Sequence, residues 1–246
     1  MNVLVCNDDG ILSEGIIALA NFLKKENKVF VIAPDGNRSG FSHAMTFRRN
    51  ITLKKTNAID GCECYVTSGT PSDCVKLGVN FLKDIDLVCS GINEGANLGT
   101  DILYCGTVNA GIEANIHKIK AIAFSNVAQS GWNFKHNIEF IEKNFDKLLK
   151  MTSVDYVLNV NMPNLPLSEI KGVKIADTGF NEYDDGYVPS LSPDTYKLVG
   201  EPLPMRDNEL EKDVHFSSLN YVTITPVVHK ITDEVLINKL KKGEFI

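Results

Sequence analysis

The sequence has no apolar run that approaches the roughly 20 residues of a membrane-spanning helix. It also has no block of lysines or arginines, and its formal net charge is −6. This charge argues against partners such as duplex DNA or RNA and against a polybasic membrane anchor. A small phosphorylated substrate stays compatible with it, because a site for such a molecule needs only local positive charge.

The N-terminus has no basic region followed by a small-residue cleavage site, so the sequence predicts no signal peptide. None of the six cysteines belongs to a C-x-x-C pair, and we expect buried free thiols. The cysteines are Cys6, Cys62, Cys64, Cys74, Cys89 and Cys105. Free thiols without an export signal indicate a cytoplasmic protein.

Several common cofactor motifs are absent as well. No H-E-x-x-H is present, and none of the five histidines has a spacing suited to zinc. The glycines of residues 91–99 are four apart, which does not fit the G-x-G-x-x-G of a dinucleotide site. The absence of G-x-x-x-x-G-K-[ST] excludes a P-loop.

What the chain does contain is an alternation of buried strands with amphipathic helices. Strands are predicted at 2–6, 28–34, 86–91, 121–125 and 157–163, and helices at 14–25, from Thr70 onward, at 107–116 and at 134–150. This order predicts an α/β fold, a Rossmann-like, doubly wound and mostly parallel sheet between two helical layers. Residues 46–53 and 62–67 alternate instead like exposed antiparallel strands.

The character of the sequence changes near residue 164, where prolines, glycines and single aspartates begin to interrupt every apolar run. We therefore predict a catalytic core at 1–163 and a smaller lobe of hairpins and loops at 164–219. Residues 220–246 are predicted to return to a strand and to end in a lysine-rich helix.

Polar loops follow three of the predicted parallel strands. The first contains the adjacent acids Asp8 and Asp9, the second contains Ser39, and the third contains Asn93. Ligands bind outside the carboxyl ends of such strands, so these side chains are expected at one site. Carboxylate, amide and hydroxyl oxygens suit Mg²⁺ or Mn²⁺, and a cation would relieve the repulsion between the two acids.

A phosphate site is the natural companion of this cation. Gly106 and Thr107 begin a predicted helix, where free backbone amides bind anions. Further candidates for substrate contact come from the second and third loops: Asn37, Arg38, Gly40 and Asn97. Each of these loops, taken alone, could be an ordinary solvated turn. The prediction of a metal and phosphate site rests on their combination.

Four motifs, in order along residues 2–125, resemble the SurE family of survival proteins. They are N-D-D-G, A-P-D-G-N-R-S-G, G-T-P-S-D-C-V and S-G-I-N-E-G-A-N-L-G-T-D-I-L-Y-C-G-T-V-N-A-G-I-E-A. Y-V-T-I-T-P at 221–226 is similar to a late strand of that family.

The resemblance implies a metal-dependent nucleotidase that hydrolyses nucleoside 5′- and 3′-monophosphates. It places the metal ligands at Asp8, Asp9, Ser39 and Asn93, with one divalent ion per subunit. It also implies that C-terminal elements are exchanged between subunits of a homodimer or homotetramer, which the composition of 164–219 fits. Cys105 departs from the family, which usually has serine there.

The expected mechanism is attack on phosphorus by a metal-activated water, with Asp8 or Asp9 assisting proton transfer. Two alternatives stay open at this point. An aspartyl-phosphate phosphatase would use an aspartate as nucleophile, although that class usually places its aspartates two apart. A Mg²⁺-binding phospho-receiver would need another aspartate at the end of a central strand, where this chain has Cys-Ser-Gly.

Overall fold

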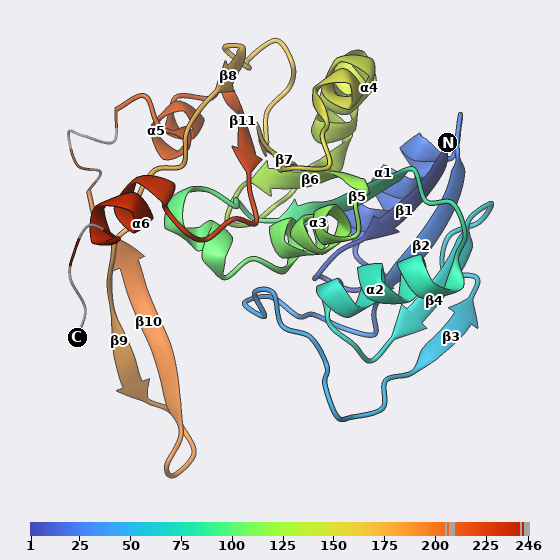
Figure 1. The fold of residues 1–246 in the computed structure, drawn as a ribbon, viewed down its shortest axis with the longest axis horizontal. Coiled ribbons are helices and arrows are strands. Elements are labelled where there is room, and N and C mark those ends of the chain that lie inside the picture. Colours follow the sequence, from blue (N-terminus) through green and yellow to red (C-terminus); the bar gives the residue numbers. More distant parts are fainter. Residues whose placement is uncertain (205, 207–209, 242, 244–246) are drawn as a thin grey trace.

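A computed structural model describes residues 1–204, 206, 210–241 and 243 of the chain. Its centre is a nine-stranded sheet with the order β3-β4-β2-β1-β5-β6-β7-β11-β8 (Figure 1). The strands are β1 (Asn2–Cys6), β2 (Lys28–Pro34), β3 (Leu53–Thr56), β4 (Glu63–Thr67), β5 (Leu87–Glu94), β6 (Lys120–Val127), β7 (Val157–Pro163), β8 (Val173–Ile175) and β11 (Val222–Val227). Most neighbouring strands run parallel, which confirms the predicted α/β class.

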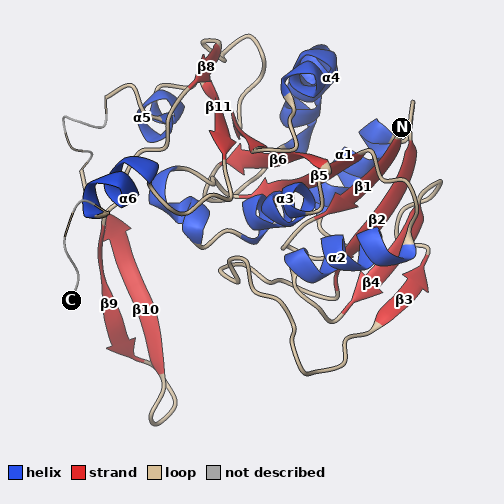
Figure 2. Cartoon of the chain, in the orientation of Figure 1, coloured by secondary structure: helices blue, strands red, loops and turns tan. Residues whose placement is uncertain are grey.

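Helices cover both faces of this sheet (Figure 2). They are α1 (Glu14–Leu23), α2 (Pro71–Phe81), α3 (Gly106–Ile116) and α4 (Phe134–Met151). Side chains alternate across a strand, so Val3 and Val5 pack on the face of α1 and α4 while Leu4 and Cys6 pack on the face of α2 and α3. The fold therefore has the three layers that the sequence predicts.

Inside the sheet, β1 has β2 on one side and β5 on the other. After β1 the chain adds β2 next to it, and β4 and β3 beyond β2. It then returns to add β5 on the opposite side of β1. Such a reversal opens a crevice at the carboxyl ends of the strands, which is where open α/β sheets bind ligands. The aspartates after β1 and Asn93 near the end of β5 lie at this edge of the sheet.

The predicted strands at 46–53 and 62–67 need correction. Residues 46–52 form no strand, and β3 begins only at Leu53. β4 pairs antiparallel with β3 but parallel with β2, and it is half-buried rather than exposed. Its alternating pattern reflects one covered face, which a parallel strand near the edge of the sheet shows as readily as an antiparallel one.

The segment after β7 contains an antiparallel hairpin, β9 (Tyr183–Pro189) and β10 (Tyr196–Pro202), which forms a sheet of its own. This hairpin projects from the body of the molecule (Figure 1), and the last helix of the chain is α6 (Glu234–Leu240). The segment also contains β8, which joins the main sheet next to β11, and α5 (Asp213–Ser218). The boundaries predicted at residues 163 and 219 stay a prediction.

No helix in the described part of the chain is both long enough and apolar enough to cross a membrane.

Candidate functional site

Asp8 lies directly after β1, and its side chain is buried. The Thr107 hydroxyl donates a hydrogen bond of 2.5 Å to Asp8 Oδ1. Burial raises the pKa of Asp8, while the Thr107 hydroxyl and the backbone amides of Gly106 and Thr107 oppose that rise. The first turn of α3 is thus built around this carboxylate.

Gly106 allows that close approach. A Cβ atom at position 106 would lie 2.9 Å from both Cβ and Oδ2 of Asp8. Carbon atoms in ordinary contact are about 3.5–4.0 Å apart, so any larger residue would have to displace the aspartate.

Asp9 is half-buried, and its Oδ2 accepts a hydrogen bond of 3.2 Å from the backbone amide of Glu94 at the end of β5. Burial and the neighbouring charge of Asp8 raise the pKa of Asp9 to about 7. Among the described residues, no lysine, arginine or histidine forms an ion pair with either aspartate. The two adjacent aspartates are therefore both part of the site, and no positively charged side chain in the described part of the chain pairs with them.

Asn93 presents its oxygen to the same place. Its amide nitrogen donates to the carbonyl of Gly95 at 2.9 Å, and this fixes the orientation of the side chain. The Thr107 hydroxyl lies 3.3 Å from Asn93 Oδ1 as well as beside Asp8. Asp8, Asn93 and Thr107, which are distant in sequence, thus form one oxygen-rich cluster.

The turn at 37–40 borders this cluster through its backbone. The amide of Arg38 donates to the carbonyl of Asp8 at 2.6 Å, and Asn37 Oδ1 accepts from the amide of Ser39 at 2.8 Å. Ser39 and Gly40 are exposed beside the cluster. The Arg38 guanidinium is paired with Asp35 at 2.5 Å, and the amides of Arg38 and Ser39 already donate within the protein. The exposed Ser39 hydroxyl is therefore the group of this turn that best suits a ligand.

Asn97 does not join the cluster through its hydrogen bonds. Its side chain donates to the Ser125 hydroxyl at 2.7 Å, and its backbone bonds to Asn159 and Asn161 on β7. These contacts anchor the loop after β5 over the ends of β6 and β7.

Sequence reasoning missed two contributions to the site. The Cys105 sulfur accepts a hydrogen bond of 3.2 Å from the amide of Val108 and so caps α3. His43, in the same loop as Ser39, contacts Glu113 on α3. Cysteine is not among the residues favoured at an N-cap, so no local pattern indicates either contribution.

The donor set fits a hard divalent cation. Among the described residues, no group of three or more His, Cys, Asp or Glu side chains is arranged to hold a metal. The site instead offers the Asp8 and Asp9 carboxylates together with amide and hydroxyl oxygens. Mg²⁺ is commonly held by one or two carboxylates, with water and substrate oxygens completing its shell. Two adjacent acids, one buried and one half-buried, without an ion-pair partner among the described residues are the physical reason that a cation would bind there.

The chain resembles proteins of known family along nearly its whole length. The family model described as "Survival protein SurE" matches residues 3–185. A protein of Clostridium beijerinckii named 5′-nucleotidase SurE is 38% identical, over 98% of both chains. A protein of the same name from Thermoanaerobacter sp. is 39% identical, over 99% of this chain and 98% of its own.

A solved structure agrees with these sequence matches. The SurE protein from Aquifex aeolicus superimposes with a TM-score of 0.84 at 34% sequence identity, over 98% of this chain and 99% of that one. Because the family model covers most of the chain and these relatives match it nearly end to end, this chain belongs to the SurE family.

Proposed function

We propose that the chain is a divalent-metal-dependent nucleotidase that hydrolyses nucleoside 5′- and 3′-monophosphates to nucleoside and phosphate. The observation that carries this proposal is the Asp8–Asp9 pair, which has no ion-pair partner among the described residues and is surrounded by oxygen donors. The relatives named 5′-nucleotidase SurE support the reaction class.

In this proposal Asp8, Asp9, Asn93 and Ser39 hold one cation, Mg²⁺ or Mn²⁺. When bound, such a cation lowers the pKa of a water molecule and shields charge on phosphoryl oxygens. The start of α3 at Gly106 and Thr107 presents the positive end of a helix dipole to the phosphoryl group. Gly40 lies in the 37–40 turn, which the bond from the Arg38 amide to the Asp8 carbonyl holds against the same place.

The reaction forms a bond between the water oxygen and phosphorus and breaks the bond between phosphorus and the nucleoside oxygen. The water gives up a proton, and the departing nucleoside oxygen gains one. Asp8 and Asp9 are the carboxylates at the site and our candidates for accepting the water proton.

The test is phosphate release from a nucleoside 5′-monophosphate after chelator treatment, before and after Mn²⁺ is restored. Activity that returns only with Mn²⁺ and is absent in Asp9→Asn supports the proposal. No release under either condition would overturn it. A trapped phosphoaspartate would instead support the aspartyl-phosphate mechanism, in which an aspartate is the nucleophile.

We also infer a homodimer or homotetramer in the cytosol. Every residue of β9 and β10 is exposed, and α6 buries none of its residues, although Tyr187, Val235 and Leu236 are large and apolar. Exposed apolar surface of this kind marks an interface. All six cysteines are free, which fits a reducing compartment. Light scattering of the purified protein measures the assembly, and a monomer would refute it.

A further inference from the structure

Residues 36–59, which connect β2 to β3 and include β3 itself, form a basic segment in an acidic protein. They contain five lysines and arginines and no aspartate or glutamate, whereas the whole chain has a formal net charge of −6. The side chains of Arg48, Arg49 and Lys54 are exposed and form no ion pair or hydrogen bond with a described residue. The basic segment therefore presents positive charge that the protein itself does not neutralise.

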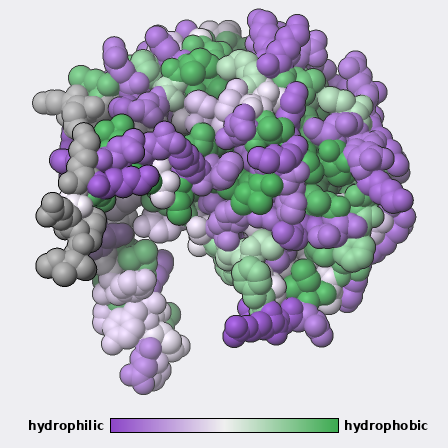
Figure 3. Space-filling view, in the orientation of Figure 1, coloured by the Kyte–Doolittle hydropathy of each residue, from purple (hydrophilic) through white to green (hydrophobic). Residues whose placement is uncertain are grey.

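The tip of the basic segment, residues 47–51, is held at both of its ends. The amide and the hydroxyl of Thr46 donate to Oδ1 and Oδ2 of Asp73 at 3.2 Å and 2.6 Å, and Asp73 lies in the first turn of α2. The amide of Thr52 donates to the Ser68 hydroxyl oxygen at 3.0 Å. Figure 3 shows strongly hydrophilic side chains at this tip, along the lower edge of the molecule. The tip is thus anchored to the start of α2 and open to solvent.

The tip combines cations with an exposed aromatic ring. Phe47 is 76% exposed and directly precedes Arg48 and Arg49. Arg48 has a φ of 62°, a left-handed conformation in which glycine would be less strained. Proteins that bind single-stranded nucleic acids use cations along the phosphates and aromatic rings that stack on the bases. A duplex does not suit this tip, because its paired bases are not free to stack on Phe47.

The basic segment and the candidate catalytic site border the same structural elements. The segment passes the start of α3, where the amide of Ser42 donates to the carbonyl of Tyr104 at 3.0 Å. The start of α2, which anchors the tip, also adjoins the aspartates: a Cβ atom at Gly106 would lie 2.9 Å from both Pro71 Cγ and Asp8 Cβ. The tip and the Asp8 cluster therefore lie on either side of the first turn of α2.

The distance between them suits a short strand of nucleotides. Asp73 is two residues beyond Pro71, and two residues span at most about 7 Å. Arg48 is likewise two residues beyond Thr46, which is bonded to Asp73. The tip therefore lies within about 20 Å of the start of α2. Phosphates of a stacked strand are about 3.4 Å apart along its axis, so about six nucleotides reach from Asp8 to the tip.

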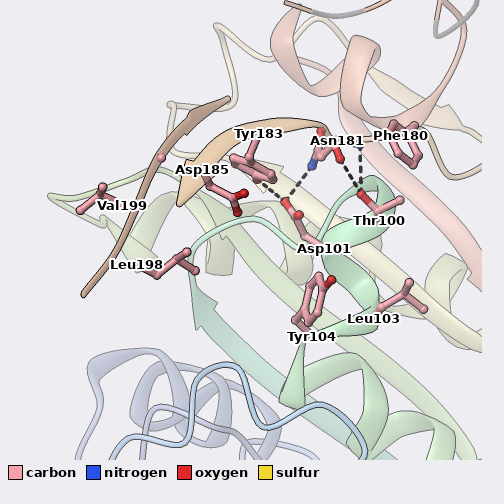
Figure 4. Close-up of a pocket in the computed structure, with 11 residues that line it drawn as sticks. Thr100, Asp101, Leu103, Tyr104, Phe180, Asn181, Tyr183, Asp185, Leu198 and Val199 are labelled. Atoms are coloured by element: carbon pink, nitrogen blue, oxygen red, sulfur yellow. Dashed lines mark hydrogen bonds between the residues drawn. The ribbon is translucent and has the colours of Figure 1, made fainter. Parts of the chain in front are cut away.

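The side of the site that faces the β9–β10 hairpin is acidic instead. A cavity of about 730 Å³ lies there, between residues 100–104 and the hairpin (Figure 4). Asp101 and Asp185 line it, and Asp101 Oδ2 accepts a hydrogen bond of 2.7 Å from the Tyr183 hydroxyl. None of the described residues that line this cavity is a lysine or arginine. A chain of phosphates is therefore repelled on this side and attracted along the basic segment.

We infer that the basic segment binds the chain of a short single-stranded oligonucleotide whose terminal phosphate occupies the candidate catalytic site. Arg48 and Arg49 pair with internal phosphates, and Phe47 stacks on a base. The terminal phosphoester is hydrolysed as proposed above, and the internal phosphodiesters stay intact. This inference rests on the proposed nucleotidase function and extends its substrates from mononucleotides to oligonucleotides that end in a phosphate.

The first experiment measures binding to the full chain by fluorescence anisotropy, in chelator so that no turnover is needed. The probe is a single strand of about ten nucleotides with a 5′-phosphate and a dye at its 3′ end. We expect saturable binding that weakens about tenfold or more when Arg48→Ala and Arg49→Ala are combined. The plot of log K against log salt concentration should become less steep by about 1.4, since each contact with a single strand contributes about 0.7.

The matched control combines Lys143→Ala with Lys147→Ala, which removes the same charge from exposed positions on α4. Its binding should stay within about twofold of that of the unsubstituted protein. Phe47→Ala should weaken binding of the probe about fivefold or more but leave the binding of an abasic strand of the same length unchanged.

The inference is overturned if the probe does not bind saturably or if the double arginine variant binds it as tightly as the unsubstituted protein. An abasic strand that binds as tightly as the probe would show that any polyanion suffices, and this too would overturn the assignment to an oligonucleotide.

The second experiment compares kcat/KM for phosphate release from the 5′-phosphorylated strand and from a nucleoside 5′-monophosphate, with Mn²⁺ present. The ratio of the two values should fall about tenfold in the double arginine variant. If the strand binds as described but neither substrate is hydrolysed, the binding surface stands and the nucleotidase proposal fails. If the mononucleotide is hydrolysed while the double arginine variant leaves the ratio unchanged, only the extension to oligonucleotides fails.

Discussion

Nε2 of His43 lies 3.0 Å from Oε2 of Glu113, and this contact joins the β2–β3 loop to α3. The other carboxylate oxygen of Glu113 lies 3.1 Å from Nε2 of His117 and 3.5 Å from Nζ of Lys76. Both joined elements carry candidate site residues, Ser39 on the loop and Thr107 on α3. The pair therefore links the two elements that carry the halves of the candidate site.

His43→Ala should weaken catalysis without unfolding the protein. The substitution releases the loop from α3, so we expect the KM for a nucleoside monophosphate and the Mn²⁺ concentration for half activity each to rise about threefold to tenfold. His117→Ala is the control, because it removes a contact of the same carboxylate that does not involve the loop. Steady-state kinetics at several Mn²⁺ concentrations measure both effects, and equal behaviour of the two variants would contradict the positioning role.

Glu113→Gln should destabilise the protein in a pH-dependent manner. Burial favours the neutral acid, but the His43 hydrogen bond, the Lys76 charge and the His117 hydrogen bond together lower the pKa of Glu113 below its usual 4.5. The ionised group therefore adds stability above pH 4.5, and this stability is lost as the pH falls through the lowered pKa. We expect a loss of about 1–3 kcal/mol at pH 7 that shrinks toward pH 3. Urea unfolding at both pH values measures it, and a loss independent of pH would refute it.

Gly106→Ala should inactivate the enzyme. The new methyl group would lie 2.9 Å from both Asp8 Cβ and Pro71 Cγ, and an aspartate displaced by about 1 Å costs roughly a hundredfold in rate. Gly186→Ala is the matched control, because nothing lies within 4 Å of a Cβ atom built there. The measurement is the rate of phosphate release by Gly106→Ala compared with that by Gly186→Ala. Full activity in Gly106→Ala would mean that the start of α3 does not position Asp8.

Asp9→Asn should abolish activity yet stabilise the metal-free protein above pH 7. Burial and the Asp8 charge raise the pKa of Asp9 from 3.8 to about 7. The folded state therefore loses stability as the pH rises between these two values, where the unfolded chain is ionised and the folded group still holds its proton, and the full cost is present above pH 7. The asparagine side chain does not ionise and so does not have this cost. We expect Asp9→Asn to raise the free energy of unfolding by at least about 1 kcal/mol, which raises the Tm by about 2–4 °C. Thermal unfolding in chelator at pH 5 and pH 8 measures the gain. A gain of equal size at both pH values would show that ionisation of Asp9 is not its cause.

Cys105→Ser should stabilise the protein without loss of activity. The Cys105 sulfur is buried and caps α3 through the amide of Val108, and a serine hydroxyl is the stronger N-cap acceptor. We expect a gain of about 0.5–1 kcal/mol in the free energy of unfolding and an unchanged KM. Denaturant unfolding and kinetics measure the two quantities. A clear fall in KM would show that residue 105 contacts the substrate.

The layered sheet could be predicted from the sequence because its causes are local. Each buried strand is a short apolar run, and each covering helix has one apolar face, so period and order together define the class. The strand at 46–53 was wrong because the alternation that suggested it is also found in an exposed loop. The parallel pairing of β4 with β2 depends on neighbours distant in sequence.

The candidate site, too, could be predicted only in part from the sequence. Asp8, Asp9, Ser39 and Asn93 could be named from the sequence, because each follows or ends a strand at the edge where such sheets bind ligands. Their role in metal binding stays a prediction. The pairing of Arg38 with Asp35 and the anchoring of Asn97 to Ser125 appear only in space, since side-chain orientation in a loop is decided by the surrounding contacts.

By itself, the sequence determined the fold class, the family resemblance and the set of oxygen donors, all of which depend on residues that are near one another along the chain. Only the tertiary structure decided that Thr107 bonds Asp8, that His43 meets Glu113 and that a hairpin encloses a cavity beside Tyr104. The residues that meet in these three places are separated by 99, 70 and 82 positions along the sequence. Local preferences carry no information about such pairs, because packing of the whole chain brings them together.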